Sequence, residues 1–412
     1  MRVAPSGGFP EGAAARGRRE GQGDGVRRIA IIGLGFVADL YLSSLAAHPD
    51  VSVFAVHDRD AERQRRFVDH WRAQGHAAVG AQMLAADDLA GFLDALSPGD
   101  VALNLTNPGS HYEVSRALLE RGVHVWSEKP LATTMEHARA LHALAAERGV
   151  MLASAPASVL GEAAQTLWAA VREGVAGSPR LIYAELDDGF IPQAPTEAWI
   201  SASGAPWPRE DEFRTGCTLE HAGYYLTWLI AMFGPIRTVA AASAELVPDK
   251  LPEGARAAPD FSTGTLFFES GPVARLTCSI IAPHDHRIRV ICDGGALELD
   301  AAWDNAAPVR FRRRFRVRRR LVEHPFPRRL KLAGDSHPKV KRTGAAAMNF
   351  ALGPVEMLDA RDEGRDCRIS ADFSLHLNEA TLALQSAGER SPPHAMTTRC
   401  APMAPMPWAR LA

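Results

Sequence analysis

The sequence predicts an α/β protein whose first half folds as a doubly wound parallel sheet. Two observations predict this fold class: apolar runs of strand length alternate with helix-period segments from Arg27 onward, and the runs are apolar on both faces. Strands of that kind need helices on both sides of their sheet. The chain has 412 residues, too many for one compact core, so we expect a second domain.

The elements of the first half follow one another in regular order. Five segments have the length and composition of buried strands: Ile29–Gly33, Val51–His57, Val101–Thr106, His124–Ser127 and Val150–Ala153. Four helix-period segments lie between them: Val37–Ala47, Asp60–Ala73, His111–Arg121 and Met135–Glu147. A ligand of a doubly wound sheet binds beyond the carboxyl ends of the strands, so the loops there are the candidate site.

Composition divides the chain into four segments. Residues 1–26 hold seven glycines, two prolines and four arginines, so we expect a disordered extension. Arg18-Arg19 is not followed by the apolar segment that an export signal needs. We expect the parallel-sheet domain over residues 27–154 and a second α/β domain over 155–390. The tail, 391–412, carries enough apolar surface to dock on the body.

The overall composition excludes several classes of protein. With 46 basic and 48 acidic side chains the net charge is −2, so we expect neither nucleic acid nor a membrane surface as partner. Five cysteines lie far apart without a CxxC pair, which argues against a disulfide framework or a cysteine-rich zinc module. We therefore expect a reducing, cytoplasmic compartment and no metal.

A glycine turn directly follows the first strand. Gly33 and Gly35 would let the backbone approach a pyrophosphate. Phe36 and Val37, at the start of the following helix, would offer free N–H groups to that pyrophosphate. Glycine turns are common, so this motif needs support from its surroundings. The order of strand, glycine turn, helix and second strand supplies that support and predicts a dinucleotide-binding site.

Asp58 strengthens this prediction because it closes the second strand, 25 positions after Gly33. A carboxylate at this place accepts hydrogen bonds from the adenosine ribose hydroxyls. The alternative role is an N-cap of the following helix. A carboxylate repels a 2′-phosphate, which favours NAD, whereas the neighbouring Arg59 leaves NADP possible.

Two more loops at the same edge carry polar residues. The first contains Thr106, Asn107, Pro108 and His111, which we place over the ribose and nicotinamide end of the cofactor. The second contains Glu128 and Lys129, directly after the strand His124–Ser127. A lysine at a buried strand end is costly unless it meets polar groups. The ordinary alternative is an exposed surface lysine.

Together these motifs resemble the Gfo/Idh/MocA oxidoreductases. The resemblance includes the segment Gly122-Val123-His124-Val125-Trp126-Ser127-Glu128-Lys129-Pro130-Leu131-Ala132. That segment is the specific part, and the resemblance covers most of residues 27–390. It implies an NAD-binding Rossmann domain followed by an α/β domain with a large open, mostly antiparallel sheet. In the family, that sheet usually holds the substrate over the nicotinamide and often builds homo-oligomers.

The family's second signature is a glycine-rich turn and a helix carrying Asp and, four residues later, His. In this chain Glu220 stands where the Asp is usual and Tyr224 where the His is usual. Four-residue spacing puts both on one helical face. A tyrosine at this place also occurs in glucose–fructose oxidoreductase. Another departure is Ala155–Leu160, where many members carry an Asn/Arg-containing segment.

The resemblance implies a catalytic set of Lys129, Tyr224 and Glu220. We expect Tyr224 to be the acid/base, with Lys129 lowering its pKa and polarising the reacting oxygen, and Glu220 orienting them. Three alternatives stay open. Tyr224 could be a core aromatic, Glu220 could be a plain helix-entry charge, and His221 could be the acid/base.

Two features of the second domain have no role in this set. One is a loop region that contains Asp187-Asp188, Trp199 and Trp207. Its aromatic rings and carboxylates could bind a carbohydrate, or the loop could close over its own aromatic side chains. The eight arginines within Arg310–Arg320 alternate with apolar residues, which predicts a strand with a solvated basic face. Binding the diphosphate of a nucleotide sugar, or subunit contacts, are alternatives for that strand.

We therefore predict an NAD-dependent oxidoreductase, with NADP possible, that moves hydride to or from a sugar, sugar derivative or cyclitol. One alternative is a glycosidase or lyase that oxidises its substrate transiently with no net redox change. Another is a non-catalytic NAD-sensing protein. A homo-oligomer formed through the C-terminal sheet is expected.

Overall fold

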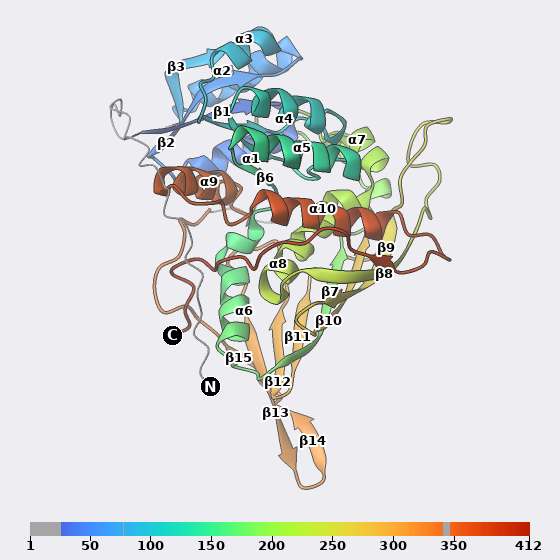
Figure 1. Cartoon of the computed structure of the whole chain (residues 1–412). Coiled ribbons are helices and arrows are strands. Elements are labelled where there is room, and N and C mark those ends of the chain that lie inside the picture. The colour runs from blue at the N-terminus through green and yellow to red at the C-terminus, as the bar shows by residue number, and fades with distance from the viewer. Residues whose placement is uncertain (1–25, 77, 341–346) are drawn as a thin grey trace, which may run out of the picture.

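A computed structural model describes residues 26–76, 78–340 and 347–412 of the chain. The expected disordered extension, apart from Val26, lies outside the described residues. Two sheets organise the molecule (Figure 1). The first is parallel, in the order β3-β2-β1-β4-β5-β6. Its strands are β1 (Arg27–Ile32), β2 (Val51–His57), β3 (Val79–Ala85), β4 (Val101–Asn104), β5 (His124–Ser127) and β6 (Leu152–Ser154).

Helices cover both faces of this sheet, which confirms the predicted doubly wound fold. In β1, Ile29 and Ile31 point into one core, and Ala30 and Ile32 point into the other. This alternation explains why the strand is apolar at every position. The helices are α1 (Phe36–Leu45), α2 (Ala61–Ala73), α3 (Leu89–Asp94), α4 (His111–Glu120) and α5 (Met135–Arg148).

Two elements of this domain, β3 and α3, are not among those predicted from the sequence. β3 is the edge strand of the parallel sheet, and its Leu84 is exposed. An edge strand is only partly buried, so its sequence, Val79-Gly80-Ala81-Gln82-Met83-Leu84-Ala85, lacks the continuous apolar run that marks the inner strands. α3 has six residues, too few for a helical period to stand out.

The second sheet has ten strands and is mostly antiparallel, as the fold prediction states. Its path runs β14-β13-β12-β11-β7-β10-β9-β8-β16, with β15 paired to β13, and β7 and β10 are parallel neighbours. The strands are β7 (Pro179–Asp187), β8 (Ile236–Ala244), β9 (Phe261–Phe268), β10 (Val273–Ser279), β11 (Ile288–Cys292), β12 (Gly295–Leu299), β13 (Arg310–Val317), β14 (Arg320–Glu323), β15 (Arg328–Arg329) and β16 (His394–Ala395).

Helices pack on one face of this large sheet and join it to the parallel one. Burial alternates along β7 and β9, so one face of each strand is packed and the other is more open. α10 lies between the two sheets, against α5 and β6 on one side and β8 and β9 on the other (Figure 1). The helices in this part of the chain are α6 (Glu162–Arg172), α7 (Arg209–Thr215), α8 (Gly223–Phe233), α9 (Leu352–Glu363) and α10 (Ala371–Gln385).

α9 crosses back from the second sheet to pack on β4 and β5 of the first. Gly353 lies against the indole of Trp126, and a Cβ at this glycine would come within 2.1 Å of the ring. Arg27 of β1 forms ion pairs with Asp50 and with Asp359 of α9. The C-terminal part of the chain therefore completes the covering of the N-terminal sheet.

The predicted basic strand over Arg310–Arg320 is a hairpin, so that expectation is wrong in extent. β13 ends at Val317, the turn contains Arg318 at a φ of +52°, and β14 begins at Arg320. The hairpin projects from the end of the sheet (Figure 1). The apolar side chain of Leu321 on this hairpin is exposed. Three arginines are paired with carboxylates: Arg310 with Asp300, Arg312 with Glu298 and Arg314 with Glu323.

The C-terminal tail docks on the body. His394 and Ala395 pair with β8, and Leu411 bridges to Leu332. Arg172 of α6 donates a hydrogen bond to the carbonyl of Ala409 at 2.6 Å. Among the described residues, every helix is too short or too polar to cross a lipid bilayer.

Candidate active site

The glycine turn after β1 has the shape that a pyrophosphate needs. Gly33 has a φ of +89°, and a Cβ there would lie 2.5 Å from the backbone nitrogen of Thr106, so only glycine fits. A Cβ on Gly35 would meet nothing within 4 Å, so the surface over the turn is open. Gly35 is the N-cap of α1 and no side chain caps this helix, which leaves its first N–H groups for an anion.

Asp58 is held against the same turn. Its Oδ2 accepts a hydrogen bond from the backbone N–H of Leu34 at 2.7 Å, and its Oδ1 accepts one from Asp60 at 2.9 Å. Asp60, not Asp58, is the N-cap of α2, because its carboxylate accepts from Glu62 and Arg63. The alternative role of Asp58, as the N-cap of this helix, is therefore wrong. The exposed Arg59 lies beside it in the chain. The turn and the carboxylate fit a dinucleotide.

The loop after β4 is braced from within. Thr106 donates its hydroxyl to Asn104 Oδ1 at 2.6 Å, and the amide of Asn107 lies 3.5 Å from Asp211 of α7. His111 is completely buried, and its two ring nitrogens lie 2.7 Å from the carbonyl of Pro130 and 2.9 Å from that of Thr106. Burial lowers the pKa of His111. His111 thus ties the loop after β4 to the loop after β5.

Glu128 forms a buried hydrogen-bonded group at the end of β5. Its Oε1 accepts from the phenol of Tyr41 at 2.6 Å, and its Oε2 accepts from the backbone N–H of Lys129 at 3.1 Å. The indole of Trp126 donates to the same phenol at 3.0 Å. Burial and the Glu128 carboxylate raise the pKa of Tyr41, so this phenol stays neutral and donates.

Lys129 and Glu220 form an ion pair between the two halves of the chain. Lys129 follows β5, and Glu220 lies in a π-helical turn, Thr218–Ala222, directly before α8. Burial disfavours the ammonium, but Glu220, Tyr224 and Glu212 outweigh it and raise the pKa of Lys129. Lys129 is therefore charged at neutral pH. A π-helical turn is a frequent feature of functional sites.

Glu220 titrates close to neutrality. Burial raises its pKa to about 7, with Lys129 acting in the opposite direction and Glu212 adding to the rise. Its side chain is almost fully buried. A carboxyl group with this pKa can accept and return a proton at physiological pH.

Tyr224 keeps its proton, contrary to our expectation. Its side chain is 8% exposed, and burial raises its pKa above the usual value, although Lys129 lowers it as we expected. The burial effect is larger because the whole ring lies inside the protein, against Trp303 at a centroid distance of 5.0 Å. A neutral phenol can donate a hydrogen bond but is not a base at neutral pH.

His221 is held between two carboxylates. Its Nε2 lies 2.9 Å from Glu212 of α7, and its Nδ1 lies 3.3 Å from Asp188, the residue after β7. Burial disfavours the imidazolium, yet these carboxylates raise the pKa of His221 to about 9. Burial likewise opposes ionisation of Glu212, but His221 lowers its pKa. His221 is thus protonated at neutral pH and cannot serve as a base in that state.

Two family models match the chain. One is described as the oxidoreductase family with an NAD-binding Rossmann fold and matches residues 27–155. The other is the GFO/IDH/MocA C-terminal domain and matches residues 164–298. Together they cover more than half of the chain. This protein belongs to the Gfo/Idh/MocA oxidoreductase family.

Curated relatives of the family match shorter stretches. Over 128 residues the chain is 31% identical to the scyllo-inositol 2-dehydrogenase (NADP(+)) IolU of Bacillus subtilis, covering 31% of this chain and 36% of that one. Over 168 residues it is 27% identical to the UDP-N-acetylglucosamine 3-dehydrogenase of Acidithiobacillus ferrooxidans, covering 40% and 47%. The chain spans about half the length of the curated relatives it matches.

Solved structures of similar fold cover nearly the whole chain. The WlbA dehydrogenase from Bordetella pertussis, in complex with NADH and UDP-GlcNAcA, superposes with a TM-score of 0.65 at 17% identity. This match covers 90% of this chain and 99% of the other. It supports the two-sheet fold of this Gfo/Idh/MocA protein.

Several residues near the predicted catalytic set have no role in the sequence-based prediction. They are Glu212, His284, His286 and Trp303. The ring of His286 packs at a tilt against Trp303, with 4.4 Å between centroids, and Trp303 contacts Tyr224. A signal was available for the histidines, because His284-Asp285-His286 is an unusual pattern in a loop. Glu212 and Trp303 had no such signal, since only the fold brings them to the site.

The aromatic loop closes on itself, as one of our two alternatives states. Trp199 and Trp207 pack edge to face at 5.1 Å, and Trp207 contacts Phe213. The backbone N–H and the hydroxyl of Ser203 both donate to Asp39 of α1, at 2.8 and 2.9 Å. This loop therefore joins the second domain to the Rossmann domain.

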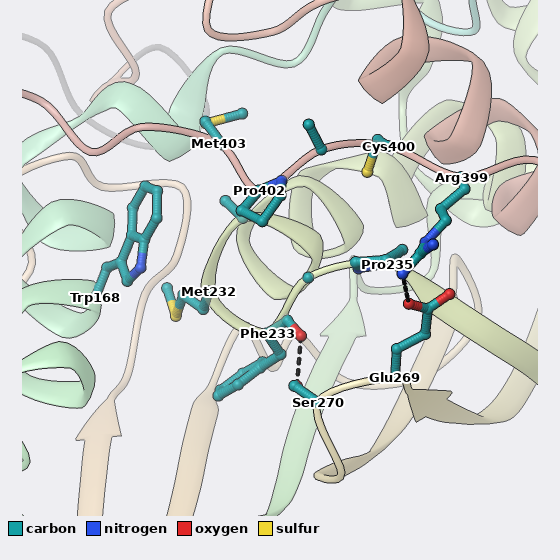
Figure 2. Close-up of a pocket in the computed structure, with 13 residues that line it drawn as sticks. Trp168, Met232, Phe233, Pro235, Glu269, Ser270, Arg399, Cys400, Pro402 and Met403 are labelled. Atoms are coloured by element: carbon teal, nitrogen blue, oxygen red, sulfur yellow. Dashed lines mark hydrogen bonds and ion pairs between the residues drawn. The ribbon is translucent and has the colours of Figure 1, made fainter. Parts of the chain in front are cut away.

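A cavity of about 830 Å³ lies elsewhere, between the end of α8 and the C-terminal tail (Figure 2). Arg399 and Glu269 form an ion pair at its edge, at 2.6 Å. Its lining residues include none of the polar residues described above. This cavity is therefore separate from the Lys129–Glu220 pair.

Proposed function

We propose that this protein is an NAD(P)-dependent oxidoreductase that transfers hydride between a nicotinamide and a hydroxyl or keto carbon of a sugar, sugar derivative or cyclitol. One observation carries the proposal: the charged Lys129 and the near-neutral-pKa Glu220 meet at the carboxyl end of the parallel sheet. The names of the curated relatives, which include an inositol and a nucleotide-sugar dehydrogenase, support the substrate class.

The cofactor would be held by residues of the loops already described. Gly33, Gly35 and the first turn of α1, at Phe36 and Val37, would hold the pyrophosphate, and Asp58 the adenosine ribose. The loop from Thr106 to Pro108 and the Glu128–Lys129 segment would border the nicotinamide end. When bound, the cofactor accepts or supplies the hydride. The carboxylate of Asp58 favours NAD, and NADP stays possible because Arg59 is free to approach a phosphate.

The protein's own residues would handle the proton. Lys129 would hold its ammonium against the substrate oxygen and stabilise negative charge there. Glu220 would accept the hydroxyl proton in the oxidation direction and return it in reduction. Tyr224, kept neutral, would donate a hydrogen bond to a neighbouring substrate oxygen. These roles change our sequence-based assignment, in which Tyr224 is the base.

We also propose that the protein works in the cytoplasm and assembles through the open face of its large sheet. Tyr183 on β7 lies between the guanidinium groups of Arg275 and Arg289, at 4.4 and 5.3 Å from its ring. These side chains point away from the core face of the strand, which carries Ile182 and Ala184. An aromatic residue flanked by arginines is typical of protein interfaces.

The test is a screen of NAD⁺ and NADP⁺ reduction with free sugars, nucleotide-linked sugars and cyclitols. We expect NADH or NADPH to appear with at least one class, in an amount equal to the keto product. Glycoside cleavage with no net change in cofactor would indicate transient oxidation instead. Binding of NAD without turnover of any substrate would favour the NAD-sensing alternative.

A further inference from the structure

Two loops at one end of the large sheet bring together a carboxylate and two imidazoles. Asp188 follows β7, and His284 and His286 lie between β10 and β11. β7 and β10 run parallel, with Asp187 opposite Ser279, so both chains leave the sheet at the same edge. An isolated bridge between Asp187 and Asp285 holds the two loops side by side. The backbone therefore fixes the positions of all three groups.

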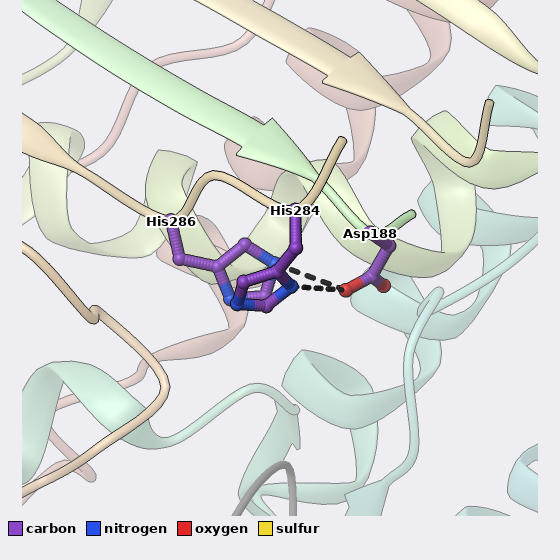
Figure 3. Close-up of side chains that lie close together, drawn as sticks. All are labelled: Asp188, His284 and His286. Atoms are coloured by element: carbon purple, nitrogen blue, oxygen red, sulfur yellow. Dashed lines mark hydrogen bonds and ion pairs between the residues drawn. The ribbon is translucent and has the colours of Figure 1, made fainter. Parts of the chain in front are cut away.

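The three side chains converge (Figure 3). His286 Nε2 lies 3.0 Å and His284 Nδ1 4.0 Å from the same oxygen, Oδ1 of Asp188. One ligand atom from each residue lies within 4.8 Å of the other two. The imidazole rings lie 4.0 Å apart between centroids. Two atoms that each lie about 2.0–2.2 Å from one metal ion are at most about 4.4 Å apart, and the two distances to Asp188 Oδ1, 3.0 and 4.0 Å, lie within that limit.

The donor set selects a class of ion. Two neutral imidazole nitrogens and one carboxylate suit a first-row transition metal such as Zn²⁺, whereas Mg²⁺ and Ca²⁺ prefer all-oxygen sites. Three protein ligands also leave a coordination position open, as in catalytic zinc sites. His286 is buried and His284 is 66% exposed, so one side of the cluster is accessible from solvent.

Neighbouring residues hold the carboxylate and link the cluster to Tyr224. The second oxygen of Asp188 lies 3.3 Å from His221, which in turn lies 2.9 Å from Glu212. Partners of this kind orient a metal ligand. On the other side the ring of His286 packs at a tilt against Trp303, and Trp303 contacts Tyr224. The cluster is therefore adjacent to the residues that we assign to catalysis.

We propose that Asp188, His284 and His286 bind one divalent transition-metal ion, whose open position takes an oxygen of the substrate. This departs from our sequence-based expectation of no metal, which rested on cysteine spacing alone. The assignment of a substrate oxygen to the ion rests on the proposed oxidoreductase function. Metal binding itself does not depend on that function.

The test uses the full chain without an affinity tag, freed of metal with a chelator and titrated with Zn²⁺ in a calorimeter. We expect one equivalent to bind, and His284→Ala to weaken binding at least tenfold. Titration with Co²⁺ should give the visible absorption of a nitrogen- and oxygen-coordinated ion. His284 is exposed, so this variant should keep its thermal unfolding temperature; Asp188→Asn and His286→Ala provide further checks.

His142→Ala is the matched control, because His142 pairs with Asp372 at 2.6 Å and these two residues belong to no cluster of three metal-binding side chains among the described residues. This variant should bind Zn²⁺ like the natural chain. Absence of a stoichiometric site, or equal affinity in the His284→Ala and His142→Ala variants, would overturn the proposal. NAD binding should be unchanged in His284→Ala, so failure of the metal site is distinguishable from failure of the oxidoreductase function.

Discussion

At the scale of single residues, burial decides which groups can exchange protons. Lys129 stays charged because carboxylates surround it, Glu220 is brought to a pKa of about 7, and Tyr224 stays neutral. Each effect arises from removing a group from water and placing it beside a charge. These protonation states are why we propose the carboxyl group, rather than the phenol, as the acid/base.

Replacing Lys129 with Ala should abolish most turnover while NAD binding is retained. The ammonium stabilises charge on the reacting oxygen, and losing such a group lowers kcat by about 10²–10⁴-fold. Steady-state kinetics and a cofactor titration would measure the two effects. Lys331→Ala, at an exposed lysine, is the control and should behave like the natural chain. Near-normal turnover of the Lys129→Ala variant would remove Lys129 from the catalytic set.

Glu220→Gln should change the pH dependence of oxidation. In the natural chain the carboxylate form must accept the proton, so kcat/KM should rise as the pH increases through about 7. The Gln variant should be much slower and should lack this rise. Rate profiles from pH 5 to 9 in both proteins would measure this change. Glu253→Gln, at an exposed site, is the control and should keep the profile of the natural chain. A profile with the same inflection in both proteins would assign the ionisation elsewhere.

At the scale of elements, α10 connects the other parts of the molecule. Its polar side chains make the connections. In the structure Asn378 accepts a hydrogen bond from the backbone of Ala132, and His376 accepts one from Ile236. Glu379 accepts from the backbone N–H and hydroxyl groups of Thr397 and Thr398. One helix thus joins the Rossmann domain, the large sheet and the C-terminal tail.

Glu379→Gln should lower the free energy of unfolding at neutral pH by about 1–3 kcal/mol, because charged hydrogen bonds are lost. Burial opposes ionisation of this carboxyl group, but its bonds to Thr397, Thr398 and His394 lower its pKa to about 2. Its folded pKa is below its unfolded value, so the stabilisation is present above about pH 4.5 and is lost as the pH falls toward 2. Urea unfolding of both proteins at pH 7 and pH 3 should show a smaller difference at pH 3.

At the scale of the whole molecule, the two domains share their packing. A continuous buried cluster runs from β1 through α9 to the large sheet. α9 belongs to the last part of the chain, yet it covers β4 and β5 of the first sheet. The N-terminal domain therefore depends on residues more than 200 positions away for part of its core.

Gly353→Ala should destabilise the whole protein, because the added methyl group would collide with Trp126. Overpacking of this kind costs about 1–3 kcal/mol. Gly388→Ala is the matched control, since a Cβ there meets nothing closer than 3.8 Å. Calorimetric melting should show a lower Tm for the first variant and a nearly unchanged Tm for the second. Equal Tm values would mean that α9 can shift without cost.

The sequence by itself determined the Rossmann sheet, the glycine turn with Asp58, and the loop that carries Lys129, because these depend on local periodicity and short motifs. Tertiary structure alone decided the rest. The edge strand β3, the return of α9, and the meeting of Lys129 with Glu220 depend on contacts between distant segments, which no local pattern records. Protonation states belong to the same group: whether Tyr224 or Glu220 can accept a proton is set by burial and neighbouring charges, and these exist only after the chain has folded.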